Sequence, residues 1–140
     1  MTWIKLCSVL FLSLNLMFTG CKSQPNEEVY ISDFYNIHEE YKDAWGNVGK
    51  YDISLPYIHC DSKSAKKLNQ TIKNEYKDLV DSLDEAKEEG YTLPDTKVSY
   101  DVYTHSNLLS LVIKEEVETE YPRYKVYHFD SKTKKRVSNK

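Results

Sequence analysis

The sequence predicts an α+β domain in which one long helix packs on an antiparallel sheet of about five strands, in the order ββαβββ. The first observation is that apolar residues in 61–90 recur at steps of three and four, the spacing of one helix stripe. The second is that two tyrosine- and isoleucine-rich segments before this stretch, and three after it, have approximate strand alternation. The third is that neighbouring strand segments are joined by short connections, which favour antiparallel pairing.

The first twenty residues predict a signal peptide and not a part of the fold. Lys5 belongs to a short charged start, residues 6–18 are an apolar stretch too short to span a bilayer, and a small-residue pair precedes Cys21. This segment resembles the lipobox of bacterial lipoproteins, with Phe18 where leucine is usual. The resemblance implies that Cys21 carries lipid; the alternative is a plain secretory signal with an incidental cysteine.

The predicted organisation is therefore a signal peptide over residues 1–20, a lipidated polar tether over 21–28 and one domain over 29–140. The resemblance to lipoproteins implies a location on the extracytoplasmic face of the cell membrane, held by the lipid. About 120 residues suffice for one hydrophobic core and are too few for two.

Two strands are expected before the helix, over residues 28–38 and 50–58. Turn-forming residues at 43–47 lie between them, so the pair is expected to be a hairpin. Residues 38–45 are also compatible with a short helix, and the pattern alone does not decide between the two.

The central helix is expected over residues 61–90, with Asp61 or Ser62 as its N-cap and Gly90 at its left-handed end. Its apolar stripe consists of Ala65, Leu68, Ile72, Tyr76, Leu79, Leu83 and Ala86. Lysines near its start and glutamates near its end oppose the helix dipole, at about 0.3–1 kcal/mol each. Burial of each large stripe residue contributes about 1.5–3 kcal/mol and outweighs this. The helix should therefore form by docking on the sheet, and an isolated peptide should be mostly unfolded.

After a connector at 92–95, three further strands are expected over residues 97–104, 108–117 and 121–130, with turns near 105–107 and 118–120. The spacing places residues 98, 100 and 102 on one face of the first of these strands.

Charge and cysteine content exclude several classes of function. Loss of residues 1–20 removes one basic side chain, Lys5, so the net charge changes from −3 to −4. A mildly acidic chain has no general attraction for nucleic acid or anionic lipid. Cys60 would be the one cysteine left beside the acylated Cys21, so no intrachain disulfide is expected. The four histidines show no metal-ligand spacing, and no cofactor is predicted. Cys60, beside His59 at the helix start, is interpreted as a packed thiol, with a nucleophile as the alternative.

Tyrosine is unusually frequent, with 12 residues in 140. A half-buried sheet explains most of them, because aromatic rings pack on pleated surfaces. A further hypothesis is that the sheet face not covered by the helix binds a ligand, since tyrosine is enriched in recognition surfaces. The candidate binding residues are Tyr100, Tyr103, Tyr124, Tyr127, Glu116 and Glu118. The two glutamates belong to an acidic turn that could steer a basic partner.

The basic tail over 132–136 is interpreted as a solvated turn, with a contact to anionic polymer or lipid headgroups as the alternative.

Three segments resemble a known module: residues 51–58 leading into 65–72, residues 99–103 with 107–111, and residues 127–134. Together they are similar to the extracytoplasmic domain of unknown function that precedes the catalytic domain of PdaC-type peptidoglycan deacetylases, and to the lysozyme-sensing ectodomain of RsiV-type anti-sigma factors. The similarity covers residues 50–137, the first half of that module, and Lys134 stands where glycine is usual. An open sheet edge near the C-terminus is therefore expected.

The resemblance implies a non-enzymatic lipoprotein of the cell envelope whose domain binds peptidoglycan or a lysozyme-like protein. One alternative is a scaffold module that forms homodimers through the open sheet edge. The other is a thiol enzyme that uses Cys60.

Overall fold

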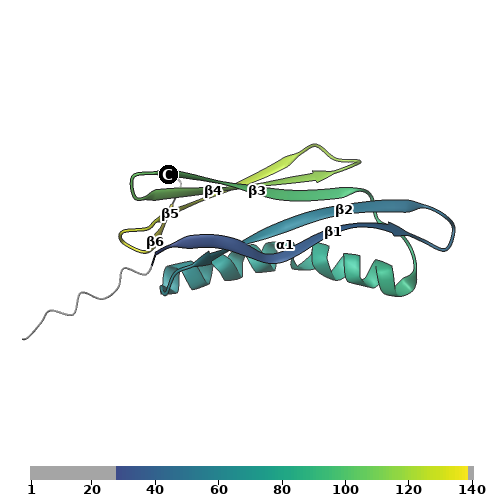
Figure 1. Cartoon of the computed structure of the whole chain (residues 1–140), viewed down its shortest axis with the longest axis horizontal. Helices are drawn as coiled ribbons and strands as arrows, with labels where there is room; N and C mark the ends of the chain where they lie inside the picture. Colours follow the sequence, from purple (N-terminus) through teal and green to yellow (C-terminus); the bar gives the residue numbers. More distant parts are fainter. Residues whose placement is uncertain (1–27, 139–140) are drawn as a thin grey trace, which may run out of the picture.

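A computed structural model describes residues 28–138 and contains one helix on a six-stranded sheet (Figure 1). The elements are β1 (Tyr30–Lys42), β2 (Val48–His59), α1 (Lys63–Glu89), β3 (Thr96–His105), β4 (Leu108–Val117), β5 (Arg123–Asp130) and β6 (Lys135–Val137). The strands lie in the sheet in their sequence order. The α+β class and the helix packed on a sheet are confirmed. The predicted signal peptide, Cys21 and most of the tether lie outside the described residues.

The predicted sheet was wrong in two respects. β2 and β3 pair in parallel, not antiparallel. The reason is that α1 has 27 residues, about 40 Å at 1.5 Å per residue, and therefore carries the chain back along the full length of β2 before β3 begins. The sheet also has a sixth strand, because Lys134 adopts a left-handed backbone (φ 54°) and turns residues 135–137 back onto β5. The basic tail is therefore part of the sheet.

The helical alternative for residues 38–45 is wrong, because β1 remains paired with β2 as far as Lys42. The turn at 43–47 is closed by the buried carboxylate of Asp43, which accepts hydrogen bonds from the backbone N–H groups of Trp45 (2.9 Å) and Asn47 (2.8 Å). A β-bulge between Asp33 and Tyr35 shifts the register near the start of β1.

Both predicted helix ends are confirmed. Ser62 is the N-cap, and its Oγ accepts a hydrogen bond from the N–H of Ala65 at 3.0 Å. Gly90 has φ 79°, and its N–H donates to the carbonyl of Ala86 at 2.9 Å. The predicted stripe is buried except for Leu79, which is half-buried.

The stripe also contains Asn69, a buried polar residue. The parallel seam between β2 and β3 extends only from the Tyr51–Thr96 pair to the Ile53–Val98 pair, so the later part of β2 lies without a β3 neighbour. There the Asn69 side chain accepts from the N–H of Ile58 at 2.8 Å and donates to its carbonyl at 2.9 Å. The helix thus supplies the hydrogen bonds that a strand would otherwise supply.

The body is elongated and has two distinct ends (Figure 1). The start of β1, the end of β2, the start of α1, the β3–β4 hairpin and the β5–β6 turn lie at one end, which we call the tether end because Glu28, the first described residue, lies there. The β1–β2 hairpin, the last turn of α1 and the β4–β5 hairpin lie at the opposite end, the far end.

Candidate functional site

Two of the four candidate tyrosines lie on the sheet face that the helix leaves uncovered. Tyr103 is 59% exposed and Tyr124 is 62% exposed. Tyr103 pairs with Ser110 across the β3–β4 ladder, and Tyr124 pairs with Lys114 across the β4–β5 ladder. Their side chains therefore point away from α1, on the face opposite the buried residues of β4.

The prediction that all four tyrosines share that face is wrong for Tyr100 and Tyr127. Tyr127 is buried on the helix side, where its hydroxyl donates to a carboxylate oxygen of Glu75. Burial, and then this hydrogen bond, raise the pKa of the Tyr127 hydroxyl. Tyr100 pairs with the buried Ile113, and its hydroxyl donates to Asp33 at 2.6 Å. Burial and the Asp33 carboxylate raise the pKa of Tyr100 to about 12. Both residues act as links within the fold.

Glu116 and Glu118 lie in a shallow hollow of about 560 Å³ at the far end, lined also by Asp52, Asp95 and Glu120. Two lysines and the β4–β5 turn form the rest of its wall. Glu116 pairs with Lys114 at 2.8 Å, whereas no ion pair is found for Glu118 among the described residues. The backbone N–H of Glu118 donates to the carbonyl of Asp95 at 2.9 Å, which holds the turn against the connector that follows α1.

The far end as a whole is acidic. Its three segments, residues 39–50, 84–95 and 114–123, carry twelve acidic and five basic side chains. Two large aromatic side chains project from it: Tyr121 in the β4–β5 turn is 94% exposed, and Trp45 in the β1–β2 turn is 76% exposed. Exposed aromatic residues within an acidic surface are suited to binding a basic protein.

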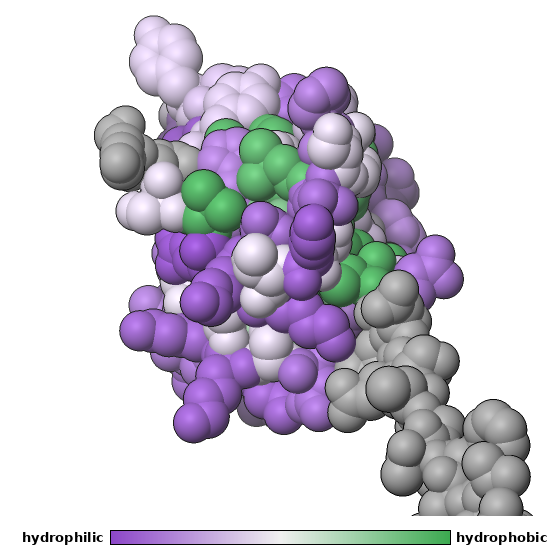
Figure 2. Space-filling model, turned by 90° about the vertical axis from the view of Figure 1, so that its left-hand side faces the viewer, coloured by the Kyte–Doolittle hydropathy of each residue, from purple (hydrophilic) through white to green (hydrophobic). Residues whose placement is uncertain are grey.

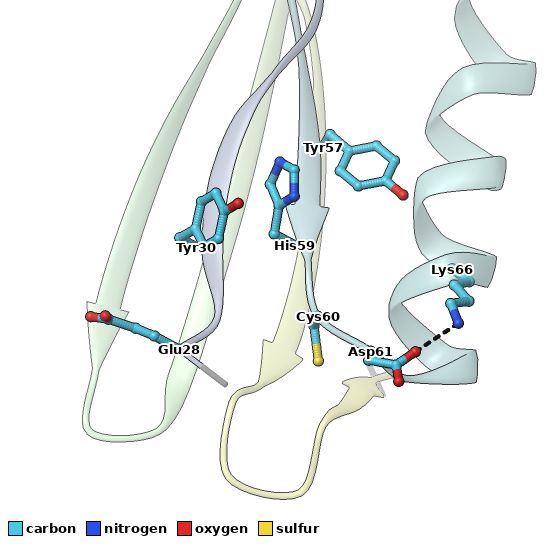
Figure 3. Close-up of a pocket in the computed structure, with 7 residues that line it drawn as sticks. All are labelled: Glu28, Tyr30, Tyr57, His59, Cys60, Asp61 and Lys66. Carbon is cyan, nitrogen blue, oxygen red and sulfur yellow. Dashed lines mark hydrogen bonds and ion pairs between the residues drawn. The ribbon is translucent and has the colours of Figure 1, made fainter. Parts of the chain in front are cut away.

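A second hollow at the tether end contains Cys60 (Figure 3). The ring of Tyr30 stacks on the imidazole of His59, with centroids 4.2 Å apart and planes 7° apart. His59 Nε2 is also hydrogen-bonded to Ser32 Oγ at 2.7 Å. Figure 3 shows the Cys60 thiol and the His59 ring pointing in different directions from β2, and Cys60 is partly buried against the core. This arrangement is that of a packed thiol and does not form a Cys–His pair.

Asp61 borders the same hollow and forms an ion pair with Lys66 at 2.7 Å. This hydrogen-bonded pair, and the more distant charge of Lys134, hold the pKa of Asp61 below its usual value. Within residues 28–138, no group of three or more histidine, cysteine, aspartate or glutamate side chains is arranged to hold a metal ion. In the same part of the chain, no helix has the length and apolar character needed to cross a membrane.

Comparison with protein-family models finds no match, and comparison with curated proteins finds none either.

Sequence reasoning missed the aromatic stack of Tyr30 on His59. These residues are far apart along the chain, and they meet because they are register partners in the β1–β2 hairpin. The hairpin was predicted, but its register beyond the bulge was not. Only the register would have identified this pair.

Proposed function

We propose that this chain is a non-enzymatic lipoprotein of the cell envelope that binds an extracytoplasmic partner, preferentially a basic, lysozyme-like protein, at its far end. Cys21 is the proposed site of lipidation, which holds the protein on the extracytoplasmic face of the cell membrane. Peptidoglycan is the other partner that the resemblance to the PdaC and RsiV modules suggests.

The observation that supports this choice of partner is the acidic far end with its two projecting aromatic residues, Tyr121 and Trp45. Twelve acidic side chains against five basic ones give that end a negative potential, although the whole chain is only mildly acidic. Such a surface accelerates the encounter with a positively charged protein. Glu116 and Glu118 lie within it and line a hollow of about 560 Å³ there.

The test is a calorimetric titration of the mature chain with lysozyme at low and at higher salt. Micromolar or tighter binding that weakens with salt is expected, because charge pairs at an exposed interface are screened. The variant Glu116→Gln/Glu118→Gln should bind more weakly, whereas Glu28→Gln/Asp101→Asn, which removes the same charge elsewhere, should bind like the wild type. Absence of heat at both salt concentrations would exclude the lysozyme-like partner.

Peptidoglycan calls for a different surface, and the same protein can be tested for it. Sugars stack on exposed aromatic rings, so the uncovered face with Tyr103 and Tyr124 is the better surface for a glycan. If peptidoglycan is the partner, sedimentation with purified cell walls should be reduced in Tyr103→Ala/Tyr124→Ala and unchanged in Tyr121→Ala. The opposite pattern would assign wall association to the far end.

One observation favours a second function, a scaffold that dimerises. β1 pairs only with β2 in the described sheet, so the outer edge of its 13 residues has no strand partner. A second copy could add its own β1 to this edge. Light scattering should then show dimers that dissociate on dilution, and a monomer at high concentration would exclude the scaffold.

A further inference from the structure

The tether end of the molecule carries a concentration of positive charge that the sequence divides between two distant segments. Residues 61–67 and 130–137 together contain seven basic and two acidic side chains. The fold brings these segments together: the backbone N–H of Arg136 on β6 donates to Ser64 Oγ on α1 at 2.7 Å. Figure 2 shows the molecule from this end, and the surface there is mostly hydrophilic, with small apolar areas among the polar side chains.

Several of these charges are available to a partner. Lys63, Lys67 and Lys135 are exposed, and no ion pair is found for them among the described residues. Of the two acidic residues, Asp61 is partly neutralised by its ion pair with Lys66 at 2.7 Å. Asp130 keeps its charge and accepts hydrogen bonds from the N–H groups that follow it in the β5–β6 turn, which leaves seven basic side chains against two acidic ones. The basic side chains therefore dominate the potential of this surface.

The position of these lysines opposes the stability of the helix. The first turn of α1 contains no acidic residue, although a negative charge there is worth about 0.3–1 kcal/mol and a positive charge costs a similar amount. A charge that opposes the helix dipole is consistent with a role in binding.

The chain itself indicates what lies opposite this surface. Glu28 lines the tether-end hollow together with Tyr30 and Asp61, and it lies only seven positions after Cys21. Seven residues reach at most about 25 Å even when fully extended. A membrane that holds Cys21 therefore lies close to the tether end. Tyr30, 56% exposed, is an amphipathic side chain of the kind that is enriched at headgroup level.

We infer that the tether end docks on an anionic membrane surface through Lys63, Lys67, Lys135 and their basic neighbours, with Tyr30 at the headgroups. The inference rests on the proposed lipid anchor for the position of the membrane. Docking in this way directs the acidic far end away from the anionic surface, where a basic partner can reach it. Lipid and basic side chains together provide the two signals that stable attachment needs.

The test uses the mature chain with Cys21→Ser, so that no acyl group contributes, and vesicles of phosphatidylglycerol and phosphatidylcholine in equal parts. Sedimentation with these vesicles is expected at about 50 mM salt and should be lost at about 300 mM, where the Debye length is shorter. Vesicles of phosphatidylcholine alone should not sediment the protein. The variant Lys63→Glu/Lys135→Glu should partition at least about 25-fold less, at roughly fivefold for each basic side chain near the surface.

The control is Lys42→Glu/Lys97→Glu, which changes the net charge by the same amount at the far end and should partition like the unaltered chain. Lys63→Gln/Lys67→Gln, a milder second pair, should also reduce partitioning. The variant Lys63→Glu/Lys135→Glu should not unfold at a lower temperature than the unaltered chain, since a glutamate is favourable at the start of a helix. Equal partitioning of all variants, or no sedimentation at low salt, would overturn the inference. Neither result depends on partner binding in solution or on acylation, so failure of the proposed function would be recognised separately.

Discussion

Asn69→Ala should destabilise the domain more than any exposed substitution on the same helix. The Asn69 side chain donates one hydrogen bond to the backbone of Ile58 and accepts another, and both groups are buried. Truncation leaves one N–H and one C=O without partners, at about 1–3 kcal/mol each. The expected loss is therefore about 2–6 kcal/mol, a large part of the 5–15 kcal/mol that is typical of a whole domain.

The assay is urea unfolding followed by circular dichroism, with the slope of the transition fitted for each variant. Gln70→Ala is the matched control, because this neighbouring side chain is exposed and bonds only to Asn74; its effect should stay within about 0.5 kcal/mol. Asn69→Asp keeps the acceptor for the Ile58 N–H but turns an oxygen toward the Ile58 carbonyl, so it should be at least as damaging as alanine. A loss below about 1 kcal/mol in Asn69→Ala would refute the account of the helix as a hydrogen-bonding partner of β2.

Three further predictions concern local backbone and titration. Ser106→Gly should stabilise the domain by about 0.5–1 kcal/mol in the same unfolding assay, because Ser106 has φ 53°, whereas Asn107→Gly, next to it at negative φ, should destabilise it by a similar amount. Burial opposes ionisation of Asp43, but hydrogen bonds from Asn47 and Trp45 outweigh it and hold the pKa of Asp43 below 3.8. The stability that Asp43 contributes is therefore present above pH 3.8 and lost as the pH falls through the lower pKa of the folded state. In acid unfolding, the wild type should lose its stability advantage over Asp43→Asn. The raised pKa of Tyr100 favours its neutral form, so the stability that Tyr100 adds is present below pH 10 and lost as the pH rises through about 12. When phenolate absorbance is followed against pH, Tyr100→Phe should lack one of the tyrosines that ionise above pH 10. An unchanged absorbance increase in that range would contradict the assignment.

The helix was predictable because its signals are local. The apolar spacing is contained in one continuous segment, and the N-cap at Ser62 and the glycine at position 90 act within the turns that they close. None of these signals depends on a residue elsewhere in the chain. The parallel pairing of β2 with β3 was not predictable from connection lengths between adjacent strands, because it depends on the whole length of α1.

The candidate tyrosines could have been divided correctly from the sequence. Tyr100 and Tyr103 are three positions apart, as are Tyr124 and Tyr127, and residues three apart on a strand point to opposite faces. The alternation alone therefore rules out a single face that carries all four. Which member of each pair is buried required the structure, since it depends on the side on which α1 docks.

The short parallel seam has a consequence for how the chain folds. The β1–β2 hairpin and the β3–β6 meander each form from residues close in sequence, whereas Tyr51 and Thr96 in the seam are 45 positions apart. Closing that loop carries an entropic cost that only three residue pairs and the packing of α1 repay. We therefore expect the two antiparallel units to gain structure first and the rate-limiting step to be their association around α1. Substitutions that weaken either antiparallel unit should then mainly slow folding, because those contacts are already formed at the rate-limiting step. Substitutions in the seam should both slow folding and speed unfolding.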